Sequence, residues 1–246
     1  MIRNIKLLFQ LFLLVLLNTN IQAQKNEKDL DFNSEVFFDE LALSVRAFEW
    51  TNVDSTRNAL NKAISHYSKA NNNCRVSHFC ALKARLFLEE GVNDSALSSF
   101  IQSSYYISES CPKKEGYFLY NSWSQLYSAI GDYTLADSVS KIALLKAKQS
   151  DNPIYELNVL TNQAVFYSEQ LEFDQAISKM LVINSKADSI NSDYHKWSSL
   201  QNLGAFYSMK KEYDSAIFYF NLFEKSIDTN TPISLIMDYY NNMGVI

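Results

Sequence analysis

The chain has 246 residues, of which 47% are hydrophobic and 20% are charged, and its formal net charge is −5. These proportions are typical of a folded globular chain and exclude an intrinsically disordered one. An acidic balance without basic clusters gives no electrostatic footprint for nucleic acid, so we expect this segment to bind none. Five glycines and three prolines leave room for long uninterrupted helices.

Residues 1–23 have the organisation of a secretory signal peptide. Two basic residues precede an apolar run at Leu7–Leu17, which only Gln10 interrupts, and a short polar stretch ends at Ala23. The run is shorter than the roughly 20 residues of a permanent membrane anchor, although an uncleaved anchor is the alternative. We expect cleavage before Gln24 and export to the periplasm or cell surface. Membrane contact would then come only through the signal or through a downstream segment outside this sequence.

Residues 24–32 are charged and aperiodic and are predicted to be a linker, whereas residues 33–246 repeat one pattern every forty residues. In each complete repeat a first helix carries a small residue, and the second helix carries a facing residue, which is threonine in the first repeat and alanine in the others. The small positions are Ser44, Ala84, Ser124, Ala164, Gly204 and Gly244, and the facing positions are Thr56, Ala96, Ala136, Ala176 and Ala216. Small side chains at both places let two antiparallel helices approach closely. The period predicts an all-α solenoid of helix hairpins.

Prolines and glycines divide these hairpins in a regular way. Pro112, Pro153 and Pro232 fall between repeats, where a proline in the first turn of a helix costs nothing. First helices are therefore expected to begin near residues 34, 74, 112, 153, 193 and 232, and second helices near Asp54, Asp94, Tyr133, Phe173 and Tyr213. Gly91 and Gly131 occupy the turn inside a hairpin, where a left-handed conformation is useful.

The final residues match an earlier repeat in register. Tyr240–Ile246 corresponds to Leu200–Phe206, which lies in the middle of a first helix. We therefore expect five complete hairpins and a truncated sixth, as in a fragment of a longer protein.

The pattern resembles the tetratricopeptide repeat (TPR) family, through Leu203, Gly204, Tyr207, Ala216, Phe220 and the turn at Gly131-Asp132-Tyr133. The resemblance covers about residues 33–246. It departs in its period, forty residues rather than the usual 34 or so, and in having Lys83 and Gln163 where the family prefers leucine. It implies a right-handed superhelical solenoid of antiparallel hairpins. Such long-helix versions are similar to arrays in exported bacterial regulators and sensors.

By this resemblance the first helices line a concave surface that holds a protein or an extended peptide. Asparagine is suited to that task because one amide offers a donor and an acceptor together. The candidate groove residues are Asn121, Gln125, Asn158, Asn162, Gln201, Asn202 and Asn242. Basic residues that family members use to clamp a terminal carboxylate are missing beside these asparagines. A polar face that is merely solvated is the alternative.

The three cysteines allow a disulfide, free buried thiols or a metal site. Cys74 and His78 are four residues apart on one helix, and Cys111 opens the neighbouring first helix, so a metal site is conceivable. In an exported protein a disulfide is favoured. Cys74–Cys80 is a poor pair, because ~9 Å of helical rise separates them. Cys74–Cys111 joins two adjacent helix starts and is the best of the three pairings.

No signature of catalysis is present in the sequence. It contains no nucleotide-binding glycine loop, HExxH zinc helix or nucleophile elbow, and its three histidines have no recognisable catalytic spacing. We expect no catalytic residue, no metal and no cofactor. The predicted function is an exported, non-catalytic scaffold that binds proteins or peptides. The alternative is the periplasmic sensor portion of a membrane-anchored histidine kinase or DNA-binding transcriptional regulator, whose output domain would lie beyond Ile246.

Overall fold

The structure is a computed structural model that describes residues 38–39, 41–42, 45 and 52–244, and within them it contains helices and no β-strand. The chain divides into two compact units, residues 1–70 and residues 71–246, and each is described by itself. None of the described helices is both long and apolar enough to cross a membrane.

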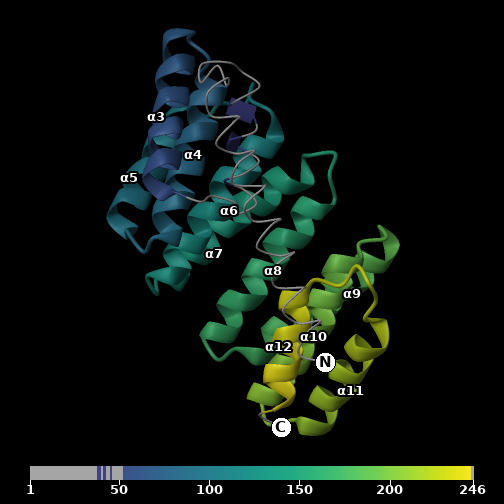
Figure 1. Cartoon of the computed structure of the whole chain (residues 1–246). Coiled ribbons are helices and arrows are strands. Elements are labelled where there is room, and N and C mark those ends of the chain that lie inside the picture. Colours follow the sequence, from purple (N-terminus) through teal and green to yellow (C-terminus); the bar gives the residue numbers. More distant parts are fainter. Residues whose placement is uncertain (1–37, 40, 43–44, 46–51, 245–246) are drawn as a thin grey trace, which may run out of the picture. The chain divides into compact units, whose positions relative to one another are not determined.

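The helices of the described residues follow one another at short intervals (Figure 1). They are α3 (Val53–Lys69), α4 (Asn73–Glu89), α5 (Asn93–Tyr106), α6 (Lys113–Ala129), α7 (Tyr133–Lys148), α8 (Ile154–Glu169), α9 (Phe173–Ser189), α10 (Asp193–Met209), α11 (Tyr213–Ser226) and α12 (Ile233–Met243).

The predicted helix starts are confirmed to within one residue from α3 to α12, and only the start near residue 34 lies outside the described residues. Pro112, Pro153 and Pro232 each stand directly before a helix. Side chains cap the first turn of other helices. Asn52 and Asp132 each accept a hydrogen bond from the backbone N–H of the residue three positions later in the chain. These caps satisfy donors that the first helical turn leaves unpaired.

The turn between the two helices of a repeat has a left-handed residue even where glycine is absent. Gly91 and Gly131 have φ values of 72° and 80°, as predicted. Leu171 and Lys211 stand at the same repeat position and have φ values of 62° and 65°. A left-handed conformation costs an L-residue roughly 1–2 kcal/mol, so packing of the flanking helices must impose the turn.

In the first unit, α3 buries one face. Leu60 and Ala63 are fully buried, and the ring of Tyr67 lies 5.7 Å from that of Phe38. Thr56, at the position where other repeats have alanine, is also buried. The predicted small residue of this repeat, Ser44, lies outside the described residues.

In the second unit, consecutive helices pack against each other from α4 to α12. We call α4, α6, α8, α10 and α12 the first helices, and α5, α7, α9 and α11 the second helices. Each first helix also packs against the next first helix, whereas the described second helices do not pack against one another. The first helices therefore form one continuous layer, and their shared face is where residues of successive repeats meet.

The small positions of the repeats are buried as the sequence predicts. They are Ala84, Ser124, Ala164 and Gly204 on first helices, and Ala96, Ala136, Ala176 and Ala216 on second helices. Large side chains fill the space beside these contacts; Phe100, Met180 and Phe220 have no exposed surface.

One polar contact explains a departure from the repeat pattern. Gln163 stands where Leu203 stands in the next repeat, and it is only 3% exposed. Its amide nitrogen donates to Ser140 Oγ at 3.0 Å, and its oxygen accepts from Lys179 Nζ at 3.0 Å. Burial lowers the pKa of Lys179. The small polar Ser140 stands where Phe100, Met180 and Phe220 stand in other repeats, so Gln163 has both the space and the partners that it needs.

Gly204 marks the closest approach of two helices. A Cβ atom added there would lie 2.5 Å from Cε1 of Phe220, a distance that packed atoms do not tolerate. We expect Gly204→Ala to lower the free energy of unfolding by about 1–2 kcal/mol, because overpacking outweighs the gain of roughly 1 kcal/mol in helix propensity. Urea unfolding followed by circular dichroism measures this change.

Gly116→Ala is the matched control. Gly116 is also helical, but its added Cβ would meet only the flexible chain of Lys146, at 3.3 Å. This substitution should leave stability unchanged or raise it by up to ~1 kcal/mol. If both alanine variants were equally stable, the close approach at Gly204 would be disproved.

Candidate functional site

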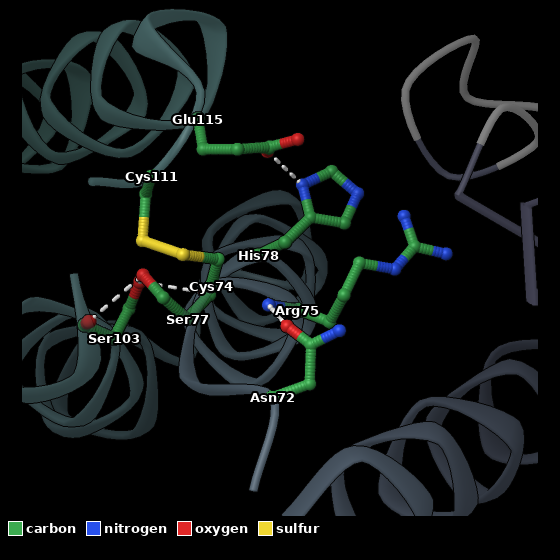
Figure 2. Close-up of polar contacts among 8 residues, drawn as sticks. All are labelled: Asn72, Cys74, Arg75, Ser77, His78, Ser103, Cys111 and Glu115. Carbon is green, nitrogen blue, oxygen red and sulfur yellow. Dashed lines mark hydrogen bonds and ion pairs between the residues drawn. A yellow bond between two sulfur atoms is a disulfide. The ribbon is translucent and has the colours of Figure 1, made fainter. Parts of the chain in front are cut away.

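The first helices α4 and α6 are joined at their starts by a covalent bond. Cys74 and Cys111, whose Cα atoms are 5.4 Å apart, form a disulfide. One turn further along both helices, Nδ1 of His78 is hydrogen-bonded to Oε2 of Glu115, and both side chains are buried (Figure 2). Ser77 adds a hydrogen bond from its Oγ to the backbone oxygen of Ser103 on α5, at 2.9 Å.

The third cysteine, Cys80, takes no part in the disulfide. Cys80 is a free, buried thiol, and burial raises its pKa to about 11. Among the described residues, no three or more histidine, cysteine, aspartate or glutamate side chains are grouped so as to hold a metal. Sequence reasoning did not predict Glu115 as the partner of His78. Its signal was spacing, because Glu115 follows Cys111 by four residues just as His78 follows Cys74.

Side-chain hydrogen bonds join α6 to α8. Asn162 Nδ2 donates to Asn121 Oδ1 at 2.9 Å, and Asn158 Nδ2 donates to Tyr117 OH at 3.0 Å. A third bond, from Ser128 Oγ to a carboxylate oxygen of Glu169, lies at the far end of the two helices. Three of the predicted groove residues are therefore bonded between helices.

A buried histidine extends this contact from α8 to α10. His195 Nε2 lies 2.9 Å from Asn158 Oδ1, and its Nδ1 lies 2.8 Å from Ser192 Oγ. Because the Asn158 nitrogen donates to Tyr117, its oxygen must accept, so His195 donates from Nε2 and accepts at Nδ1. Burial lowers the pKa of His195, which favours this neutral ring.

The contacts between first helices have two sequence separations. Partners are 37 residues apart in Cys74–Cys111, His78–Glu115 and Asn158–His195, and 41 apart in Tyr117–Asn158, Asn121–Asn162 and Ser128–Glu169. The period is forty residues. Each of these residues therefore contacts a residue of the next repeat that lies either three positions before or one position after its own equivalent there. The two separations describe one repeated packing geometry.

Between α10 and α12 the side chains do not pair in this way. No hydrogen bond or ion pair joins these two helices within the described residues, and a cavity of about 410 Å³ lies between them. Its lining residues are Gln201, Asn202, Ala205, Leu235, Asp238, Asn241 and Asn242. We call this cavity the α10–α12 pocket.

The polar groups of the α10–α12 pocket are largely free to bind a ligand. Gln201 is only 5% exposed, yet its side chain makes no hydrogen bond to the described residues, and neither do those of Asn242 and Asp238. The side-chain nitrogen of Asn202 donates to the backbone oxygen of Ser198 at 2.8 Å, which leaves the side-chain oxygen of Asn202 available. The pocket therefore offers donors and acceptors that the fold does not consume.

The seven predicted groove residues thus fall into three groups. Gln201, Asn202 and Asn242 line the α10–α12 pocket, whereas Asn121, Asn158 and Asn162 bond between helices. Gln125 is half-buried on α6, and its side chain is unpaired in the described part of the chain. Asp238 was not predicted. It stands two periods, eighty residues, after Asn158, which is one of the predicted groove residues.

The disulfide should contribute strongly to stability. It closes a separation of 37 residues, and chain-entropy arguments assign roughly 3–4 kcal/mol to such a loop. We expect the double variant Cys74→Ser/Cys111→Ser to unfold at a clearly lower urea concentration. Adding a reductant should lower the wild-type midpoint to that of the variant and leave the variant unchanged. Equal midpoints for the oxidised wild type and the variant would contradict this contribution.

Comparison with known proteins identifies the fold but no family. No family model matches this chain, and no curated protein is significantly similar to it in sequence. Among solved structures, BtubC (BKLC) from P. vanneervenii is similar, with a TM-score of 0.64 over 80% of this chain and 84% of that chain. The two sequences are 15% identical. At this identity the similarity shows the fold alone, a helical, repeat-like arrangement.

Proposed function

We propose that this protein is an exported, non-catalytic scaffold of the TPR type that binds a partner protein through an extended peptide segment. The observation that carries the proposal is the α10–α12 pocket, where Gln201 and Asn242 keep unused amide groups on the layer of first helices. A peptide backbone presents one donor and one acceptor per residue, which amides of this kind can bind together.

The proposed architecture is a right-handed superhelical solenoid of antiparallel hairpins. Its support is the helix packing in the second unit, where neighbouring first helices contact one another and the described second helices do not. In such an arrangement the first helices lie on the inner side of the curve. By repeat position α12 is a first helix. Its exposed Met237 and Tyr240 stand forty residues after Trp197 and Leu200, which pack with residues of α11.

Export is the second part of the proposal. The signal pattern of residues 1–23 supports it, and the Cys74–Cys111 disulfide would persist in an oxidising compartment rather than in a bacterial cytosol. When the full sequence is expressed in a Gram-negative host, we expect a periplasmic product whose measured mass is that of a chain beginning at Gln24. A product that retains residues 1–23 in the cytosol would contradict export.

The binding proposal is tested with a displayed library of random twelve-residue segments, anchored at both ends so that no free terminus is present. We expect the library to yield binders. Their affinity should fall by the equivalent of about 1–3 kcal/mol in Gln201→Ala/Asn242→Ala, because each lost amide leaves a backbone group of the peptide unpaired.

The matched control is Asn162→Ala, which removes an amide of the same layer that bonds to Asn121 rather than lining the pocket. It should change the affinity less than twofold. Failure to recover any binder, or equal loss of affinity in both variants, would overturn the proposed site.

A further inference from the structure

We infer that the α10–α12 pocket selects a segment carrying a lysine or arginine side chain, which pairs with Asp238. This inference rests on the proposed function and names the chemistry of its ligand. Among the described residues that line the pocket, Asp238 is the only charged one, and it is exposed. Within the described residues it forms no ion pair or hydrogen bond, so its negative charge is available to a ligand.

The lysine of α10 and the lysine directly after it are already in ion pairs outside the pocket. Lys196 Nζ lies 2.6 Å from Asp188, and Lys210 Nζ lies 2.7 Å from both Asp174 and Glu212. α12 itself contains no lysine or arginine. The charge of the pocket is therefore uncompensated by the two helices that form it.

The same arrangement disfavours acidic ligands. A terminal carboxylate or an acidic side chain would need a cation or several N–H donors to replace its hydration. The described residues of the pocket supply amide donors but no cation, and Asp238 would repel a second negative charge. We expect an internal segment, with its backbone on the amides, rather than the carboxyl end of a chain.

The apolar lining suits the stem of a long basic side chain. Leu235 and Ala205 stand among the polar residues of the pocket. Lysine and arginine pack their methylene groups on apolar surface while the charged end remains near water. The cavity of about 410 Å³ lies within the range of roughly 300–1,000 Å³ that is typical of ligand pockets.

The experiment uses the same anchored twelve-residue library on three versions of the full chain: wild type, Asp238→Asn and Asp214→Asn. Asp214 is a matched control, because it is exposed in the first turn of α11 and does not line the pocket. We expect lysine or arginine to be enriched at one position by wild type and Asp214→Asn, but not by Asp238→Asn.

A selected segment is then synthesised with blocked ends, once with its basic residue and once with glutamine in its place. Wild type should bind the basic form about two- to fivefold more tightly, as expected for a solvent-exposed ion pair. Asp238→Asn should bind both forms equally. Binders without basic enrichment, or with enrichment that survives in Asp238→Asn, would overturn this inference and leave the proposed function standing. Recovery of no binders at all would overturn both.

Discussion

The contact between successive first helices is the constraint on which the rest of the second unit depends. Small residues such as Gly204 and Ala216 let each first helix and its second helix pack closely. The first helices then meet one another along a single layer, and a polar group on that layer that does not bond within its own helix has two possible fates. Such a group either bonds to the next helix or keeps its hydrogen-bonding capacity for water and ligands. The reason is that burying a polar group without any hydrogen bond costs free energy.

Along the chain the structure passes from the first fate to the second. α4 and α6 share a disulfide and the buried pair of His78 with Glu115. α6 and α8 share amide and hydroxyl bonds, and α8 and α10 share the contact of His195 with Asn158. α10 and α12 share a cavity instead. In the proposed function, the binding site therefore lies where two neighbouring first helices share no side-chain hydrogen bond among their described residues.

Local sequence signals predicted the helices well because their causes are local. Proline before a helix, a capping Asn or Asp, and glycine in a left-handed turn each act within a few residues, and the forty-residue period locates them repeatedly. Gly204 was also predictable, since a small residue recurs at its position in every repeat. The turn at Leu171 shows the limit of such rules, because helix packing imposes there what the residue itself disfavours.

Side-chain pairing could not be predicted from residue type alone. Asn162 and Asn202 occupy equivalent positions, but the residue 41 before Asn162 is Asn121, whereas the one before Asn202 is Thr161. Thr161 bonds to the backbone of its own helix, so Asn202 lacks an interhelical partner. The outcome depends on distances of a few ångströms between helices from different repeats, and the 37- and 41-residue separations become visible only once those helices are placed.

The central claim is that binding capacity is confined to the unpaired amides of the α10–α12 pocket. The most direct test is the nuclear magnetic resonance spectrum of the asparagine and glutamine side-chain amides, recorded as a library-selected segment is added. The amide signals of Gln201, Asn202 and Asn242 should shift, while those of Asn121 and Asn162 stay in place. Shifts at Asn121 and Asn162 with none at Gln201 and Asn242 would contradict the account.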